Sequence, residues 1–175
     1  MNILAIIPAR GGSKGIPNKN IVKLNGHPLI YYTIREALKV KQFQRVLVST
    51  DSEKIKTVSK SCGLEVPFLR PEKFATDTTR TIDAVIDLLD TLRVDYEETY
   101  DYVCLLQPTS PLRVANDIES CINIVSEYGS GSVVSLCRID EPHPVKMKQI
   151  KGGLVSPLLE RTDSSIPRQE LPEVY

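Results

Sequence analysis

Short apolar runs, rich in β-branched residues, alternate along most of this chain with segments of helical period. Such runs predict strands, because these side chains favour a pleated and buried surface. The runs are Ile3–Ile7, Arg45–Ser49, Val66–Leu69, Tyr102–Leu106 and Ser132–Leu136. Alternating βα units whose strands are apolar on both faces are typical of a mainly parallel sheet between helices. We therefore predict a three-layer α/β fold.

Four helices are expected between these strands. Apolar side chains recur three and four positions apart over Leu29–Leu38, Ile55–Cys62 and Ile82–Leu92, which is the spacing of one buried helix face. A fourth helix is predicted to begin at Asn116, whose side chain can form a capping pair with Glu119.

The pattern changes from Cys137 onward. Prolines punctuate a polar stretch of mixed charge, with strand-like pieces only at Val145–Ile150 and Leu154–Leu158. Because such a segment has little core of its own, two parts are predicted: an α/β domain at 1–136 and an extended arm at 137–175. We expect the arm to pack on a second subunit, and a disordered tail is the alternative.

Polar loops follow four of the predicted strands, at Pro8–Asn20, Thr50–Ser52, Arg70–Thr81 and Gln107–Arg113. In open parallel sheets, ligands bind beyond the carboxyl ends of the strands. The four loops therefore predict one composite cleft suited to a nucleotide or a sugar.

The first of these loops combines glycines with positive charge: Arg10, Gly11, Gly12, Lys14, Gly15 and Lys19. The glycines are expected to let the backbone adopt conformations that a side chain would forbid, so that several N–H groups converge on one anion. The chain has no Asp or Glu before Glu36, and we expect the loop cations to be left without acidic partners. These features predict a polyphosphate site.

Neither of the two commonest phosphate motifs is present. A P-loop needs a second glycine where Ile16 stands, and Ser13 interrupts the dinucleotide fingerprint. A P-loop NTPase and a Rossmann dehydrogenase are therefore disfavoured. The alternative for the loop is an ordinary glycine-rich surface turn.

Composition narrows the class further. The 175 residues carry 22 basic and 22 acidic side chains and are 41% apolar, as in a soluble globular domain. No apolar run approaches the roughly 18 residues of a membrane span, and no basic region precedes Ile3–Ile7, so a cytoplasmic protein is expected. Balanced charge argues against nucleic acid as a partner, and the four scattered cysteines indicate no metal or nucleophilic site.

Four blocks of residues together resemble the acylneuraminate cytidylyltransferases, which include the CMP-sialic acid synthetases and their legionaminate and pseudaminate relatives. The blocks are Ile-Pro-Ala-Arg-Gly-Gly-Ser-Lys-Gly at 7–15 with Lys19-Asn20, Val-Ser-Thr-Asp-Ser at 48–52, Arg70-Pro71 with Ala-Thr-Asp-Thr at 75–78, and Leu-Gln-Pro-Thr-Ser-Pro-Leu-Arg at 106–113. Glu-Pro-His-Pro at 141–144 and Arg168-Gln169 extend the resemblance.

The resemblance implies a nucleotide-diphospho-sugar transferase-like fold in a homodimer and a specific reaction. The anomeric hydroxyl of a nine-carbon 2-keto sugar acid would attack the α-phosphorus of CTP and release pyrophosphate. Without a covalent enzyme intermediate, the protein would act by positioning and charge neutralisation.

The resemblance also assigns residues to roles. The triphosphate would be held by Arg10, the Gly11, Gly12 and Ser13 amides, Lys14 and Lys19, with Arg10 or Lys19 stabilising the leaving pyrophosphate. Cytosine and ribose contacts would come from Asn20, Arg70, Thr79 and Thr81. Gln107, Lys146 and Arg168 would contact the sugar acid, and Arg168 is included among the catalytic residues.

Neighbouring residues receive structural interpretations. Asp77 is expected to cap the third helix and Asp51 the second. Arg80 is interpreted as an exposed residue at a helix start, and Arg113 as a member of a structural ion pair or a ligand of a carboxylate.

Magnesium is the cofactor that the resemblance implies. Family members hold it through aspartates after an Asn-Gly-x-x-Tyr stretch that would follow Tyr175, so we expect the ligands beyond residue 175. The alternatives are a CTP-binding protein without efficient turnover and another sugar nucleotidyltransferase, such as a CMP-Kdo synthetase.

Overall fold

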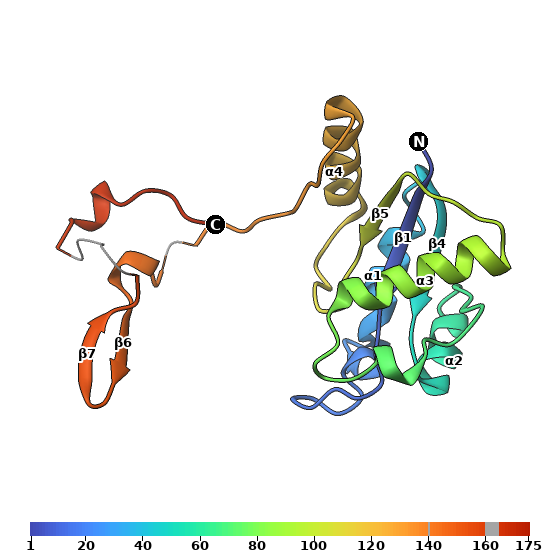
Figure 1. Cartoon of the computed structure of the whole chain (residues 1–175), viewed down its shortest axis with the longest axis horizontal. Coiled ribbons are helices and arrows are strands. Elements are labelled where there is room, and N and C mark those ends of the chain that lie inside the picture. The colour runs from blue at the N-terminus through green and yellow to red at the C-terminus, as the bar shows by residue number, and fades with distance from the viewer. Residues whose placement is uncertain (140, 160–164) are drawn as a thin grey trace. The chain divides into compact units, whose positions relative to one another are not determined.

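The computed structural model describes residues 1–139, 141–159 and 165–175 of the chain. Two compact units are present, Met1–Gly131 and Ser132–Tyr175, and Figure 1 shows the elements of each. The compact units therefore meet five residues before the boundary expected from the sequence. The interpretation of 137–175 as a dimerisation arm stays a prediction.

A three-stranded parallel sheet forms the centre of the first unit, in the order β4-β1-β5. Its strands are β1 (Ile3–Pro8), β4 (Phe43–Ser49) and β5 (Tyr102–Leu105). Both neighbours of β1 run parallel to it. Three of the five predicted strands are thus confirmed.

The central strand is buried on both faces. Ile3, Ala5 and Ile7 belong to a core cluster with residues of α1 (Leu29–Ala37), α2 (Glu53–Ser61) and α4 (Ala115–Tyr128). The alternate residues Leu4 and Ile6 pack with Val85, Leu88 and Leu92 of α3 (Thr81–Asp95), which crosses the other face of the sheet in Figure 1. This alternation explains why the strand is apolar at every position, and it confirms the three-layer fold.

The predicted strands at Val66–Leu69 and Ser132–Leu136 are wrong, because neither segment pairs with a neighbour in the described part of the chain. Val66 is only 6% exposed and enters the core from irregular backbone. Val134 and Leu136 are 69% and 67% exposed. An apolar run becomes a strand only where an adjacent strand accepts its hydrogen bonds.

The caps predicted for α2 and α4 are also wrong. Helix α2 is capped by Ser52, whose Oγ accepts a hydrogen bond from the Ile55 N–H at 3.4 Å, and not by Asp51. Helix α4 begins one residue earlier than expected, and its Asp117 carboxylate accepts a hydrogen bond from the Val114 N–H at 3.0 Å. At each helix start, the polar residue one position after the predicted cap makes the hydrogen bond to an end-of-helix N–H group.

The second unit contains an antiparallel hairpin of β6 (Lys148–Lys151) and β7 (Leu154–Pro157). A short 3-10 turn, η3 (Pro144–Lys146), precedes it and η4 (Arg168–Glu170) follows it. The first unit adds a small hairpin of β2 (Lys23–Leu24) and β3 (His27–Pro28), and the 3-10 turns η1 (Lys19–Ile21) and η2 (Glu72–Phe74).

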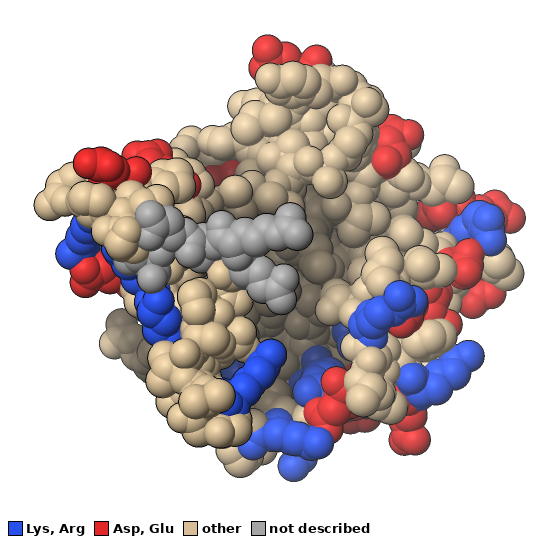
Figure 2. Space-filling view, turned by 60° about the vertical axis from the view of Figure 1, so that its left-hand side comes forward, with Lys and Arg blue, Asp and Glu red and all other residues tan. Residues whose placement is uncertain are grey.

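None of the helices in the described ranges has the length and apolar character needed to cross a bilayer. Figure 2 shows basic and acidic side chains side by side on one face of the molecule. This mixture reflects the equal numbers of the two charges in the sequence.

Candidate functional site

A cleft of about 650 Å³ opens where β1 and β5 end. Three of the four predicted loops line it. The cleft wall includes nine of the predicted ligand residues: Arg10, Ser13, Lys14, Lys19, Asn20, Arg70, Thr79, Thr81 and Gln107. The structure thus brings together most of the predicted nucleotide residues and one of the predicted sugar residues. Gly11 and Gly12 do not line the wall.

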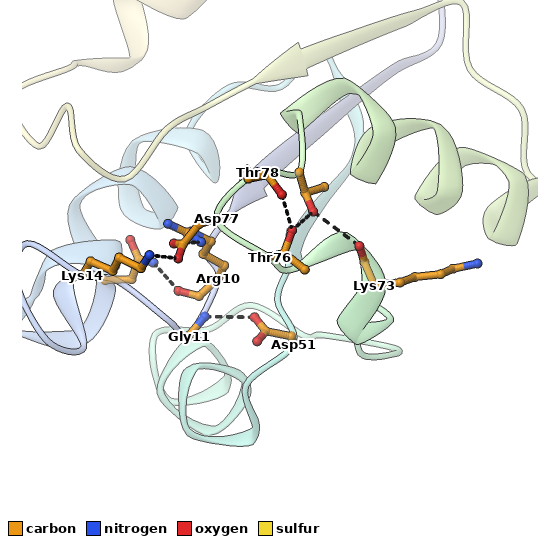
Figure 3. A network of polar contacts seen from close by, with 10 residues as sticks. Arg10, Gly11, Lys14, Asp51, Lys73, Thr76, Asp77 and Thr78 are labelled. Atoms are coloured by element: carbon orange, nitrogen blue, oxygen red, sulfur yellow. Dashed lines mark hydrogen bonds and ion pairs between the residues drawn. The ribbon is translucent and has the colours of Figure 1, made fainter.

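The remaining predicted loop, Thr50–Ser52, does not line the cleft but contacts the glycine-rich loop and anchors it. The Gly11 N–H donates a hydrogen bond to Asp51 Oδ1 at 2.9 Å, as Figure 3 shows. A Cβ at Gly11 would lie 3.1 Å from the Ser52 Cβ, whereas Gly12 and Gly15 face open space. Close packing therefore favours glycine at position 11.

The expected backbone conformation of this loop is wrong. Gly11, Gly12 and Gly15 are not among the glycines with positive φ. The Gly11 N–H is used by Asp51, and the Ser13 N–H donates to the Gly11 carbonyl at 3.0 Å. Two of the three amides expected to converge on phosphate therefore have partners within the protein, and positive side chains carry most of the loop's capacity for anions.

Asn20 fixes the position of Arg10. The Asn20 side chain is only 5% exposed, and its Nδ2 donates a hydrogen bond to the Arg10 carbonyl at 3.0 Å. Immediately before, the Ala9 N–H donates to the Ser49 carbonyl at 2.9 Å and extends the β1–β4 ladder. The guanidinium of Arg10 is consequently presented from a well-anchored backbone.

Arg10 and Lys14 meet a carboxylate from another loop. Asp77 Oδ1 lies 2.6 Å from Arg10 Nη1, and Asp77 Oδ2 lies 2.6 Å from Lys14 Nζ (Figure 3). The hydrogen bonds from Lys14 and Arg10 lower the pKa of Asp77. The expectation that these cations lack acidic partners is wrong, because Asp77, which lies 67 and 63 positions after Arg10 and Lys14, meets them at the same edge of the sheet.

Asp77 therefore does not cap the third helix. The N-cap position of α3 is Arg80, without a side-chain cap. Arg80 is exposed, pairs with Asp83 at 2.7 Å and lines the cleft, so its interpretation as a helix-start residue is confirmed. Among the residues that the structure describes, Lys19 has no acidic partner.

Arg70 lies half-buried in the wall, held by Ser49. Its Nε donates to Ser49 Oγ at 3.0 Å and its Nη2 to the Ser49 carbonyl at 2.7 Å. Burial lowers the pKa of Arg70, the nearby Arg10 lowers it further, and Asp51 opposes the shift. An arginine remains protonated under these conditions, so Arg70 adds a fixed positive charge to the cleft.

Threonine hydroxyls tie together the loop that carries Asp77. Thr76 Oγ1 lies 2.7 Å from Thr79 Oγ1 and 3.3 Å from Thr78 Oγ1, and Thr79 also donates to the Lys73 carbonyl at 3.3 Å (Figure 3). This network fixes the approach to Thr81, where α3 begins.

The Arg113 side chain supports the loop after β5 by bonding to the loop's backbone. Its Nη2 donates a hydrogen bond to the Gln107 carbonyl at 3.3 Å, and burial lowers its pKa. No acidic side chain in the described ranges forms an ion pair with Arg113, so the structural ion pair considered for it is not found. The contact leaves the Gln107 side chain at the cleft wall.

Lys146 and Arg168 line a second pocket of about 420 Å³, formed within the second unit. Arg168 forms an ion pair with Glu141. Lys146 donates a hydrogen bond to the Ile166 carbonyl. The structure thus groups the two predicted sugar contacts of the arm, and their roles stay predictions.

A magnesium site does not fit the described residues. No group of three or more His, Cys, Asp or Glu side chains gathers in the described part of the chain. The two carboxylates nearest the glycine-rich loop are both engaged, Asp51 with the Gly11 N–H and Asp77 with two cations. Magnesium in phosphate sites normally needs one or two free carboxylates.

The parallel sheet, its helical layers and the basic cleft beyond its strands define a three-layer α/β protein with a candidate ligand site at the carboxyl edge of the sheet. A family model described as Cytidylyltransferase matches residues 4–146. The chain belongs to the cytidylyltransferase family, as the resemblance in its sequence motifs indicated.

Two relatives whose names specify an activity agree with this family assignment. The chain is 44% identical over 160 residues to the CMP-N,N'-diacetyllegionaminic acid synthase of Legionella pneumophila, covering 91% of this chain and 68% of that protein. It is 34% identical over 177 residues to an N-acylneuraminate cytidylyltransferase of Streptococcus agalactiae, covering 100% of this chain and 41% of that protein. This chain therefore spans only part of each relative.

Solved structures support the fold. The structure of CMP:2-keto-3-deoxy-manno-octonic acid synthetase, complexed with CTP, matches with a TM-score of 0.63 at 21% identity, over 74% of this chain and 49% of that one. At this identity the likeness concerns the fold alone. It agrees with the predicted nucleotide-diphospho-sugar transferase-like architecture.

Proposed function

We propose that this protein transfers a cytidylyl group from CTP to the anomeric hydroxyl of a nonulosonic, sialic-acid-like sugar. The observation that carries the proposal is the cleft lined by Arg10, Lys14 and Lys19 in a member of the cytidylyltransferase family. The names of its relatives support CTP and a nine-carbon sugar acid as substrates.

In the proposed reaction the sugar's anomeric oxygen attacks the α-phosphorus of CTP. A new P–O bond forms, the bond from the α-phosphorus to the bridging oxygen breaks, and pyrophosphate leaves. The proton of the anomeric hydroxyl passes to water. Arg10, Lys14 and Lys19 bind the β- and γ-phosphates, and Arg10 or Lys19 stabilises the charge that develops on the leaving group. One well-placed donor of this kind lowers the activation barrier by about 3 kcal/mol.

The remaining cleft residues bind the rest of the two substrates. Asn20, Arg70, Thr79 and Thr81 contact the cytidine moiety, and Gln107 contacts the sugar. This assignment is supported by their common position on the cleft wall. Lys146 and Arg168 line the pocket of the second unit and bind the sugar's carboxylate and glycerol tail, as the resemblance implies. No step is assigned to magnesium.

The direct test supplies CTP, Mg²⁺ and one sugar acid at a time, with CMP-sugar and pyrophosphate measured by chromatography. N-Acetylneuraminate, N,N'-diacetyllegionaminate and pseudaminate are the candidate acceptors, and Kdo is the control. CMP-sugar from a nonulosonate supports the proposal. Preference for Kdo, or for another nucleotide, rejects it.

The alternative kept from the sequence is a CTP-binding protein without efficient turnover. CTP binding measured by calorimetry, with no CMP-sugar formed at any Mg²⁺ concentration, would identify a CTP-binding protein without turnover. The calorimetric and product measurements together separate this outcome from a protein that does not bind CTP.

We also propose a cytoplasmic homodimer, because CTP is a cytoplasmic metabolite and the hairpin of the second unit exposes large apolar side chains. Ile150, Leu154 and Val155 are 74%, 77% and 66% exposed. Sedimentation of the wild type should show a dimer that Val155→Lys weakens. A monomer at high protein concentration would reject this part of the proposal.

A further inference from the structure

We propose that Asp77 is an internal counter-ion that competes with pyrophosphate for Arg10 and Lys14 and so promotes release of this product. The inference rests on the proposed function, since it needs a phosphate chain to enter the cleft. It concerns a residue for which the sequence suggested only a helix cap.

The geometry makes the competition direct. Asp77 uses each of its oxygens on a different cation, at 2.6 Å in both cases. The Lys14 side chain is 81% exposed, yet its ammonium is directed to this carboxylate. Phosphate oxygens at the same donors would stand beside a second negative group, and like charges at that separation repel. Asp77 must therefore move aside when a phosphate chain binds.

The ion pairs of Asp77 are weak enough for phosphate to replace the carboxylate reversibly. Arg10 and Asp77 are about one-third exposed, at 33% and 36%, and ion pairs of that exposure are weak. A phosphate chain carries more charge than one carboxylate, so it displaces Asp77. Once pyrophosphate begins to leave, the carboxylate recovers its partners and reduces rebinding.

The loop keeps the carboxylate close at hand. Thr76, directly before Asp77, is bonded to Thr79 at 2.7 Å, and Thr79 donates to the Lys73 carbonyl. Displacing Asp77 therefore needs only a side-chain rotation on an anchored loop. Lys19, which has no acidic partner in the described ranges, is available for the first contact with the phosphates.

The test measures the affinity of Asp77→Asn for three ligands by calorimetry. Pyrophosphate and CTP should bind about three- to tenfold more tightly than to wild type, as expected from removal of one partly exposed ion-pair partner. CMP, which lacks the β- and γ-phosphates, should bind within about twofold of wild type. Inhibition of turnover by pyrophosphate should strengthen in parallel.

The matched control is Asp90→Asn. Asp90 lies on α3, pairs with Arg93 at 2.8 Å and does not line the cleft, so the variant makes the same change in net charge without touching the loop cations. Its affinities should equal those of wild type. Equal tightening in both variants would assign the effect to overall charge and overturn the inference.

The outcomes separate this inference from the proposed function. Pyrophosphate binding to Asp77→Asn that is unchanged or weaker, in a protein that binds CTP, overturns the role of Asp77 alone. A wild type that binds neither CTP nor pyrophosphate overturns both proposals.

A further test uses the wild-type protein alone and so does not depend on whether a variant folds. Lys14 and Arg10 lower the pKa of the Asp77 carboxyl, and carboxyl-carbon NMR can follow its titration. Saturating pyrophosphate should raise this pKa, because the cations turn to phosphate and a new negative charge arrives. A pKa that remains equally low with pyrophosphate bound overturns the inference.

Discussion

At the scale of single residues, close packing between two loops accounts for glycine at position 11. Gly11→Ala should destabilise the protein by about 1–3 kcal/mol, the usual cost of overpacking, because its Cβ would lie 3.1 Å from the Ser52 Cβ. Urea unfolding measures the change. Gly12→Ala is the control, since open space surrounds that position; equal effects of the two variants would contradict this explanation.

Asp51 acts on the same loop through its hydrogen bond to the Gly11 N–H. Asp51→Ala should weaken CTP binding about tenfold and lower the free energy of unfolding by about 1–3 kcal/mol, as expected when an amide loses a charged acceptor. Calorimetry and urea unfolding measure the two effects. Asp51→Asn keeps an acceptor oxygen and should recover most of both; no recovery would indicate that the charge itself matters.

Lys19 differs from the other loop cations because no described acidic side chain pairs with it. In the proposed site, Lys19→Ala should raise the Kd for CTP about tenfold through loss of one charge-assisted contact. Lys23→Ala is the matched control, because Lys23 is exposed in β2 and does not line the cleft. Equal weakening by both variants would point to a general charge effect.

Residue types predicted which loops form the cleft, but not which side chains partner each other within it. The basic loop was evident from Arg10, Lys14 and Lys19, and the structure places all three on the wall. The partner Asp77 could not be predicted, because it comes from a distant loop whose approach depends on α3 and the threonine network. Short-range patterns suggested a helix cap instead.

At the scale of elements, a buried carboxylate joins two helices on one face of the sheet. Glu36 of α1 is only 3% exposed. Its Oε2 accepts a hydrogen bond from the Ala115 N–H at 3.1 Å, at the start of α4, and its Oε1 accepts from Arg35 and Lys39 at 2.8 Å. Although burial alone raises the pKa of Glu36, the bonds from Lys39, Arg35 and Ala115 together lower it.

A pH-dependent stability follows from this lowered pKa. The stabilisation is fully present above the ordinary glutamate value of 4.5 and is lost as the pH falls through the lower folded-state pKa. Glu36→Gln should therefore cost about 1–2 kcal/mol at pH 7, with a difference from wild type that shrinks in acid. Urea unfolding between pH 7 and 3 measures it.

The control for that titration is Glu53→Gln. Glu53 is 70% exposed and lies 3.7 Å from Lys56, so the exchange should change stability by less than about 0.5 kcal/mol at any pH. A constant difference between wild type and Glu36→Gln across the range would show that shape, and not charge, explains the effect.

Elements with a strong apolar period were predictable, and those that depend on a neighbour were not. The helices α1, α2, α3 and α4 and the three paired strands agree with the patterns. The apolar residues of α3 do not all face the core: Ile82 and Ile86 are 53% and 51% exposed, whereas Leu88 is buried. Periodicity indicates a helix, but tertiary packing decides which residues its core face includes.

At the scale of the whole molecule, β1 should be the most protected part of the chain. It has a hydrogen-bonded neighbour on each side and helices over each face. Native-state hydrogen exchange should give the Leu4–Ile7 amides the largest protection, whereas the exposed β6–β7 hairpin should exchange first. Comparable protection of the hairpin would instead indicate that a partner covers it.

The overall architecture was predictable because it follows from alternation and from right-handed βα connections. The distribution of the predicted sugar contacts between the two pockets was not predictable. Lys146 and Arg168 line a pocket of the second unit, whereas Gln107 lines the cleft of the first. Nothing in the spacing of these residues along the chain reveals in which pocket each lies.

The direct passage from β1 into the basic loop has a practical consequence. Arg10 closely follows the central strand of the sheet. A ligand bound there should therefore stabilise the first unit against cooperative unfolding. A ligand at 100 times its Kd should add about 2.7 kcal/mol to the free energy of unfolding. A dye-based melting screen across the common nucleotides would then rank them before any sugar substrate is in hand.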